Sequence, residues 1–163
     1  MSGYTILDYH GGRDPEVAAL VLSIQNDEAG IDLPIEEQPD LLDIAAAYRE
    51  GGFWVAQVDS VIVGTIGALR YDDSGILKKF FVRSDFRGSQ GPASALYAKV
   101  NDWARAQGLA ALYLDTPSVA TRSHAFYRKA GFELVDRSAL PDGYGFPDCD
   151  SLIFRLTLLS DAA

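Results

Sequence analysis

"FFVRSDFRGSQGPASALYAKV", residues 80–100, joins two expected elements and decides how the rest of the chain is interpreted. The apolar run "ILKKFFV", which ends inside this stretch, predicts a buried strand over 76–82. A loop with two glycines, Gly88 and Gly91, follows. Pro92 then stands where a helix is expected to begin, a position at which its missing N–H costs little. The stretch therefore predicts a strand, a glycine loop and a helix in direct succession.

This order of elements suits the binding of phosphate. The first amides of a helix have no partner inside the helix, and the helix dipole places positive potential there. Glycines allow the backbone to approach an anion closely. Arg83 and Arg87 add positive charge beside the loop. We therefore expect an anionic ligand of the phosphate class at this loop.

Two common phosphate-binding motifs fit the loop poorly. The dinucleotide fingerprint needs G-x-G-x-x-G and an acidic residue about 20 positions later. The loop offers only Gly88 and Gly91, although Asp115 ends the next expected strand at a suitable distance. The P-loop is excluded because the chain contains no Gly-Lys-Ser/Thr.

Composition predicts one compact protein domain, residues 1–163, because 48% of the 163 residues are hydrophobic. No segment is long and apolar enough to span a bilayer, and the first residues lack the pattern of a signal peptide. The single cysteine, Cys149, cannot form an internal disulfide, and we interpret it as an incidental thiol. These features together predict a cytoplasmic location without a membrane partner.

The net charge of −9 is distributed unevenly. Residues 70–137 hold 11 of the 14 Lys and Arg but only 7 of the 23 Asp and Glu. Overall acidity argues against a nucleic-acid partner, since such proteins present a basic face. The basic middle favours a small anionic ligand, and the acidic remainder favours a cationic one. Acids that merely keep the surface soluble are an equally good interpretation.

Hydrophobic periodicity and turn residues predict four helices and seven strands. The expected helices cover 14–26, 40–50, 92–107 and 118–130, with a loop over 27–38. The expected strands cover 4–9, 53–58, 61–69, 76–82, 109–115, 132–136 and 150–158. Early neighbours are antiparallel, and the later strand–helix–strand units allow parallel crossovers. The fold class is therefore α/β (α+β), with a single mixed, mostly antiparallel sheet of about seven strands flanked by helices.

Three motifs in this order resemble the GNAT superfamily of N-acetyltransferases. The family's coenzyme-A loop reads Arg/Gln-x-x-Gly-x-Gly/Ala after a valine and before a leucine. Here those places are filled by Val82, Arg87-Gly88, Gly91, Ala93 and Leu96. Arg87 lies four residues before Gly91 instead of three, so the loop carries one extra residue. "AFYRKAGFELV", residues 125–135, is similar to the family's Y-x-x-x-G-F signature, and "FWVAQVDSVIVGTIGAL" is similar to its central hairpin.

The resemblance implies that acetyl-CoA is the cosubstrate and that an amine attacks its thioester directly, without a metal. Strands 76–82 and 109–115 would splay apart, and the pantetheine arm would pair with an exposed strand edge. The amide of Val82, or its neighbour Phe81, would stabilise the oxyanion. The backbone amides implied in pyrophosphate binding belong to Arg87, Gly88, Ser89, Gln90, Gly91 and Ala93.

Tyr127 occupies the tyrosine position of the family and is the implied general acid. The departing thiolate needs a proton, and a phenol with a pKa of about 10 is close enough to a thiol's value of about 8.5 to supply or share one. The alternative is that Phe126 and Tyr127 are aromatic packing on a helix. His124, one helical turn earlier, could line the same cleft, but a surface or capping position is the favoured interpretation.

The acceptor site is less defined. The strand over 76–82 contains no carboxylate, so the general base stays open among Asp27, Glu28, Asp72 and Asp73. In the family, the segment between the first two helices commonly forms a wall of the acceptor site. Here residues 27–43 hold seven acids and no basic residue. This pattern predicts a cationic acceptor, and a solvated acidic loop remains the alternative.

Asp27 and Glu28 are the acceptor-site residues that we expect, and Tyr144 in "PDGYGFPDCD" is a second candidate. The predicted function is transfer of an acetyl group from acetyl-CoA to a primary amine of a small molecule or peptide. A non-catalytic acyl-CoA sensor or interaction module with the same fold is the alternative, and a dinucleotide-dependent enzyme is a third. A homodimer is compatible with the resemblance.

Overall fold

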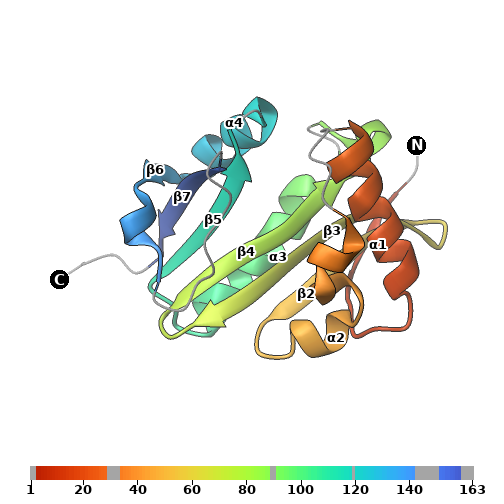
Figure 1. The fold of residues 1–163 in the computed structure, drawn as a ribbon, viewed down its shortest axis with the longest axis horizontal. Helices are drawn as coiled ribbons and strands as arrows, with labels where there is room; N and C mark the ends of the chain where they lie inside the picture. The colour runs from red at the N-terminus through yellow and green to blue at the C-terminus, as the bar shows by residue number, and fades with distance from the viewer. Residues whose placement is uncertain (1–2, 29–33, 89–90, 119, 142–150, 159–163) are drawn as a thin grey trace. The chain divides into compact units, whose positions relative to one another are not determined.

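A computed structural model describes residues 3–28, 34–88, 91–118, 120–141 and 151–158. Seven strands form one sheet in the order β1-β2-β3-β4-β5-β7-β6 (Figure 1). The strands are β1 (Thr5–Asp8), β2 (Gly52–Val58), β3 (Val61–Tyr71), β4 (Ser74–Val82), β5 (Ala111–Pro117), β6 (Glu133–Val135) and β7 (Ser151–Thr157). The helices are α1 (Asp14–Leu22), α2 (Ile44–Ala47), α3 (Ala93–Ala106) and α4 (Thr121–Lys129). The predicted order of elements and the mixed sheet are confirmed.

The sheet is mostly antiparallel. Its antiparallel pairs include β1–β2, β2–β3, β5–β7 and β6–β7, whereas β4 and β5 are parallel. The turn between β2 and β3 contains Asp59 and Ser60 at φ +50° and +69°. Two left-handed central residues define the type I′ turn, whose twist matches that of a hairpin. The predicted hairpin is therefore confirmed.

Contacts divide the chain into two compact units. Unit 1 comprises Met1–Leu69 and Lys78–Trp103, and unit 2 comprises Arg70–Leu77 and Ala104–Ala163. A cluster of buried residues that includes Val17, Val21 and Ile44 forms a core of unit 1, where α1 and α2 pack against β2 and β3. In unit 2, Leu112 and Phe154 on the neighbouring strands β5 and β7 are fully buried. Each unit therefore has its own apolar centre.

Two predicted helices differ from the structure. The helix expected over 40–50 is a 3-10 turn at Pro39–Leu41 followed by the single turn of α2, because the Asp43 side chain accepts a hydrogen bond from Ala46 N and starts a new helix. α1 continues as a π-helix, η1 (Ser23–Glu28), so the expected loop begins too early. The backbone of Asp27 and Glu28 is therefore helical.

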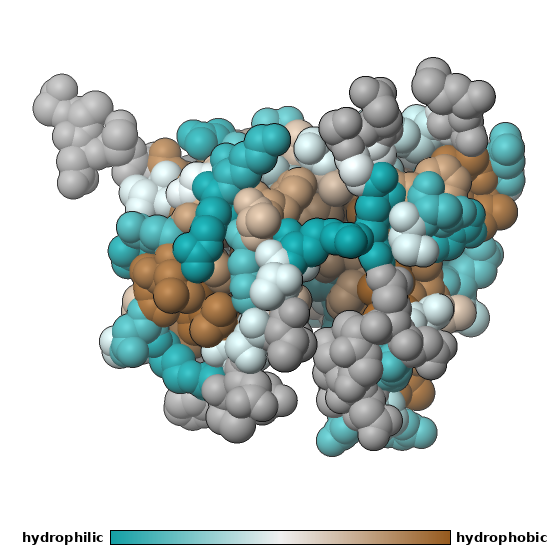
Figure 2. Space-filling view, turned by 90° about the horizontal axis from the view of Figure 1, so that it is seen from above, coloured by the Kyte–Doolittle hydropathy of each residue, from teal (hydrophilic) through white to brown (hydrophobic). Residues whose placement is uncertain are grey.

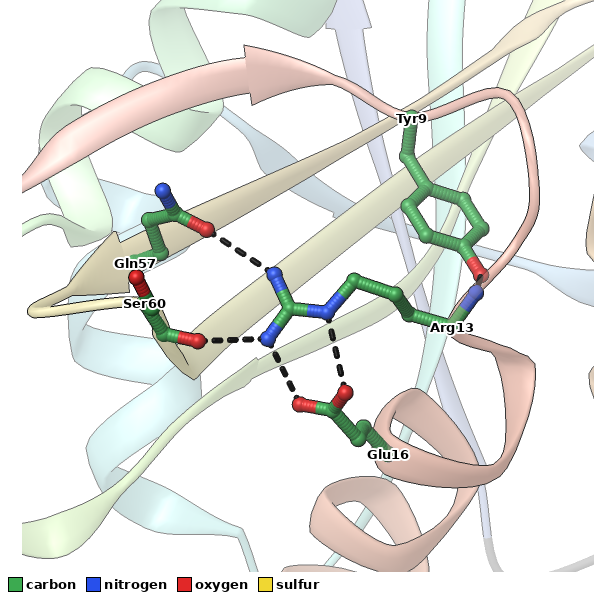
Figure 3. Close-up of polar contacts among 5 residues, drawn as sticks. All are labelled: Tyr9, Arg13, Glu16, Gln57 and Ser60. Carbon is green, nitrogen blue, oxygen red and sulfur yellow. Dashed lines mark hydrogen bonds and ion pairs between the residues drawn. The ribbon is translucent and has the colours of Figure 1, made fainter.

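The Arg13 side chain connects the start of α1 to the β2–β3 hairpin through hydrogen bonds (Figure 3). Its guanidinium donates to the side chain of Gln57 and the carbonyl of Ser60, and it forms a two-bond ion pair with Glu16. The Tyr9 hydroxyl accepts from Arg13 N at 2.8 Å and donates to Asp14. The N-terminal helix is therefore fixed to the sheet by polar contacts as well as by its apolar face.

None of the helices in the described part of the chain is long and apolar enough to cross a bilayer. Large hydrophobic side chains with high exposure are Tyr4, Leu7, Leu42, Val61 and Leu134. On the face drawn in Figure 2, hydrophilic residues lie between the hydrophobic ones.

Candidate functional site

The end of β4 has an irregular backbone. Lys79 lies inside the strand at φ +52°, in the left-handed region that non-glycine residues rarely adopt. The Thr65 hydroxyl on β3 donates to the Lys79 carbonyl at 2.7 Å and stabilises this conformation. Three residues later the strand ends at Val82, which is buried, and Arg83 N donates to the Val63 carbonyl at 2.8 Å. A residue in the left-handed region breaks the regular hydrogen-bond pairing of a strand, as a β-bulge does. The residues of β4 after Lys79 therefore do not continue the regular pairing of the residues before it.

The glycine loop follows a short 3-10 turn, η4 (Ser84–Phe86). The Arg87 side chain folds back, and its Nε donates to the Val82 carbonyl at 2.8 Å. Gly88 has φ +110°, whereas a Cβ atom on Gly91 would lie 1.9 Å from the Phe86 carbonyl oxygen. The two glycines are therefore required for different reasons, Gly88 by its backbone angle and Gly91 by the close approach of the chain.

Two of the predicted pyrophosphate donors make hydrogen bonds within this loop. Arg87 N donates to the Ser84 carbonyl at 3.4 Å, and Gly91 N donates to the Gly88 carbonyl at 3.0 Å. Ala93 is the first residue of α3, and Leu96 N makes the first helical bond, to the Pro92 carbonyl at 2.8 Å. The helix thus begins one residue after Pro92, and Ala93 belongs to the first turn, whose amides point out of the helix end. Ser89 and Gln90 lie outside the described residues.

The charge beside the loop is partly compensated. The Arg83 guanidinium forms two hydrogen bonds to Asp85, at 2.7 and 2.9 Å, and lies over the Phe86 ring. This ion pair lowers the pKa of Asp85 and raises the pKa of Arg83. Unit 1 therefore brings the end of β4, the glycine loop and the start of α3 together, as the sequence predicts.

Tyr127 lies on α4 in unit 2 and is only 6% exposed. Its ring packs near Phe126, Phe132 and Phe154, with centroid distances of 5.9, 5.6 and 6.0 Å. Burial, and to a lesser degree the charge of Asp115, raises the pKa of Tyr127. The phenol is therefore held in its protonated form. Its ring also packs against other aromatic rings, which is the alternative role given in the sequence analysis.

His124 is buried, so its expected surface position is wrong. Its ring lies 5.6 Å from that of Phe154. Residues three apart on a helix share a face, which places His124 on the same buried face of α4 as Tyr127. The polar residue pattern of α4 concealed this, because Arg122, Arg128 and Lys129 surround it in the sequence.

The predicted acceptor residues are only partly described. η1 carries Asp27 and Glu28, whose side chains lie outside the described part, as do Tyr144 and Cys149 entirely. Asp72 and Asp73 are exposed in the turn before β4. Val82 is the last residue of β4, so the length of the strand separates these two acids from it.

Two of the acids in segment 27–43 serve the structure. Asp43 caps α2, and Asp40 accepts a hydrogen bond from Tyr48 and lies 3.8 Å from the Lys79 ammonium. Glu36 and Glu37 are exposed. Lys79 was not predicted as the partner of Asp40, although a charged residue inside the apolar run "ILKKFFV" was the available signal.

Unit 1 also contains a cavity of about 370 Å³. Its aromatic walls are Tyr9, Tyr48, Phe53, Trp54 and Trp103. Trp103 lies ten residues along α3 from Ala93, about 15 Å at the rise of an α-helix. The cavity is therefore distinct from the glycine loop at the start of α3.

Comparison with known proteins identifies the class that this fold defines. The acetyltransferase (GNAT) family matches residues 19–132. An acetyltransferase structure from Streptococcus agalactiae is 35% identical, with a TM-score of 0.91 over 96% of this chain and 99% of that one. The chain belongs to the GNAT acetyltransferase family.

Two further relatives give context. Human N-acetyltransferase 8 is 36% identical over 108 residues, which cover 61% of this chain and 47% of the relative. The chain thus spans about half the length of that curated relative. The N-acetylglutamate synthase structure from Neisseria gonorrhoeae, complexed with coenzyme A and N-acetyl-glutamate, shares the fold at 20% identity, with a TM-score of 0.72 over 98% of this chain and 36% of that one.

Proposed function

We propose that the chain transfers the acetyl group of acetyl-CoA to a primary amine. The observation that carries the proposal is the tight loop that leads directly into α3, in which the Phe86 carbonyl leaves no room for a Cβ atom on Gly91. A loop of this kind lets the backbone come close to an anion at the positive N-terminal end of a helix, where a pyrophosphate is stabilised. Membership of the GNAT family and the coenzyme A bound by a relative of the same fold support this ligand.

The pyrophosphate would lie against the loop from Arg87 to Gly91 and the amide of Ala93. Because Arg87 N and Gly91 N donate to the Ser84 and Gly88 carbonyls, these two amides would have to turn from those acceptors to reach it. Within that loop, Arg87 contributes twice: its side chain holds the Val82 carbonyl, and its positive charge lies beside the proposed anion. Acetyl-CoA supplies the activated acetyl group. The amide of Val82, or of Phe81, would donate to the thioester carbonyl and stabilise the negative charge that develops on its oxygen.

The reaction then needs three proton movements. The ammonium form of the acceptor loses a proton to a base, and the amine nitrogen attacks the carbonyl carbon. As the carbon–sulfur bond breaks, the nitrogen gives up a second proton and becomes the amide, and the departing thiolate gains one. We assign the proton for the departing thiolate to the Tyr127 hydroxyl. Burial raises its pKa, so the hydroxyl is protonated at neutral pH but is a weaker acid than an exposed phenol, and it would share its hydrogen with the thiolate as the negative charge develops on sulfur. Asp27 and Glu28, carried by η1, are the proposed acceptor-site carboxylates.

The acceptor that we propose carries positive charge besides its reacting amine. Glu36 and Glu37 are exposed in the segment that follows η1, and no basic residue occurs over 27–43. Their charge would attract a cationic small molecule or peptide. A panel of polyamine, aminoglycoside-like, lysine-peptide, neutral and acidic amines tests this, and acetylation of neutral or acidic amines alone would contradict it.

Thiol release from acetyl-CoA, measured across this panel, tests the activity itself. Binding of acetyl-CoA and of NAD is compared by thermal shift, since a ligand that binds only the folded state raises Tm. We expect a shift with acetyl-CoA and thiol release with at least one amine. Binding without thiol release would instead support the non-catalytic acyl-CoA sensor.

A further inference from the structure

A continuous chain of polar side chains crosses the buried part of unit 1. The Lys79 ammonium donates to Gln38 Oε1 at 2.7 Å, and Gln38 Nε2 donates to Gln25 Oε1 at 2.7 Å. Gln38 is 2% exposed and Gln25 8%. The chain of side chains therefore joins β4, the turn before Pro39 and the π-helix η1, three segments that are far apart in the sequence.

The orientation of the central amide follows from chemistry. Lysine has donors only, so Gln38 must present its oxygen to Lys79 and its nitrogen to Gln25. A buried ammonium without partners would be costly, which makes the Gln38 oxygen and the nearby Asp40 carboxylate necessary. Asp40 is itself held by the Tyr48 hydroxyl at 2.6 Å. Each group in the chain thus fixes the position of the next.

Both ends of this chain lie next to parts of the proposed active site. Lys79 is fixed twice, by its side chain and by the Thr65 hydroxyl on its carbonyl, and it lies three residues before Val82. At the other end, Gln25 lies two residues before Asp27 in η1. The side-chain contacts are therefore a direct link between the strand proposed to hold the thioester and the helix proposed to line the acceptor site.

We propose that Lys79 and Gln38 are positioning residues that set the distance between η1 and the end of β4, and so align the acceptor amine with the thioester. The proposal rests on the proposed function. A misplacement of about 1 Å can slow an enzyme roughly a hundredfold, so a fixed spacer of this kind has a measurable effect. The glycine loop is held by separate contacts, between Arg87 and Val82 and between Gly91 and Gly88. Loss of the spacer should therefore leave acetyl-CoA binding intact.

The test compares Lys79→Met and Gln38→Met with the full wild-type chain. Lys99→Met is the matched control, because Lys99 is exposed on α3 and its removal changes the net charge equally. We expect kcat/KM for the amine to fall by about tenfold to a hundredfold in both network variants, with the Kd for acetyl-CoA within about twofold. The double variant should be no worse than the single ones, since the two residues act as one unit.

Conservative variants separate positioning from general stability. Lys79→Arg retains a donor for Gln38, and Gln38→Glu retains an acceptor for Lys79 while the Gln25 amide can turn to donate. Lys79→Arg and Gln38→Glu should recover most of the kcat/KM that the Met variants lose. We expect this recovery even if Lys79→Met also lowers Tm. Wild-type kcat/KM in the Met variants would overturn the proposal, and so would a parallel loss of acetyl-CoA affinity.

Amide hydrogen exchange across Ser23–Glu28 tests the link without any turnover. We expect faster exchange there in Lys79→Met and Gln38→Met, and wild-type exchange in Lys99→Met. Faster exchange in a protein that acetylates no amine would refute the proposed function and leave the link between β4 and η1 standing. Unchanged exchange would overturn the link itself.

Discussion

The Phe86 carbonyl oxygen lies 1.9 Å from the point that a Cβ atom on Gly91 would occupy. No side chain fits there without movement of the backbone, so Gly91 is required by the loop itself. We therefore expect Gly91→Ala to lower both Tm and acetyl-CoA affinity, because the loop must open to admit the methyl group. Thermal unfolding and calorimetry on the same sample measure the two effects.

Gly88→Ala is the matched comparison. A Cβ at Gly88 meets no atom within 4 Å, but its φ of +110° is unfavourable for alanine. The expected loss of stability is about 1 kcal/mol, from backbone strain alone. A smaller fall in Tm for Gly91→Ala than for Gly88→Ala would contradict the close approach of Gly91 to Phe86.

Tyr127→Phe removes one hydroxyl and keeps the ring that packs near Phe132 and Phe154. We expect kcat to fall roughly a hundredfold, the usual scale of a lost general acid, with the Kd for acetyl-CoA nearly unchanged. Tyr4→Phe, at an exposed position, is the control. Steady-state kinetics with the best amine of the panel decide the matter, and an unchanged kcat would exclude Tyr127 from the proton transfer.

Three buried tyrosines make stability depend on alkaline pH. Burial and the hydrogen bond to Asp14 raise the pKa of Tyr9 to about 12, and burial raises the pKa of Tyr48 and Tyr127 as well. In the unfolded chain these phenols lose their protons near pH 10, while the folded chain keeps them. The unfolded state then binds fewer protons, so stability falls as pH rises above 10.

Urea unfolding between pH 8 and 11.5 measures this effect. We expect a constant free energy of unfolding up to about pH 9.5 and a steady fall above it. A Tyr127→Phe protein should show a shallower fall, because one of the three groups is gone. Equal stability at pH 8 and pH 11 would mean that the phenols are not protected by the fold.

Arg13→Lys tests the contacts drawn in Figure 3. A lysine is a single point donor and cannot bridge Glu16, Gln57 and Ser60 together as the planar guanidinium does. We expect a lower Tm and faster amide exchange at the start of α1, with kinetic constants unchanged. Arg49→Lys, at an exposed position, should leave both stability and exchange as they are.

Local patterns in the sequence were sufficient for most of the fold. Alternation and turn residues predict the seven strands in their correct order, and Asp59-Ser60 marks the hairpin. The succession of strand, glycine loop and helix could also be predicted, because glycine permits tight turns and proline fixes its own φ at the start of a helix. These features depend on neighbours within a few residues.

Features that depend on distant contacts could not be predicted in the same way. The π-helix at Ser23–Glu28 has no local sequence mark, and its Gln25 meets Gln38 thirteen residues later. The left-handed Lys79 is stabilised by Thr65, a partner on another strand. His124 was misplaced because its burial depends on Phe154 of β7. Pairings of this kind arise only when the chain has folded.

A crystal structure with acetyl-CoA bound tests the central claim most directly. The proposed function predicts density for the pyrophosphate against the backbone amides around Gly88 and Gly91 and at Ala93 of α3, with the thioester carbonyl near the amide of Val82 or Phe81. Acetyl-CoA bound elsewhere, for instance in the aromatic cavity beside Trp54 and Trp103, or a loop left empty at saturating ligand, would contradict it.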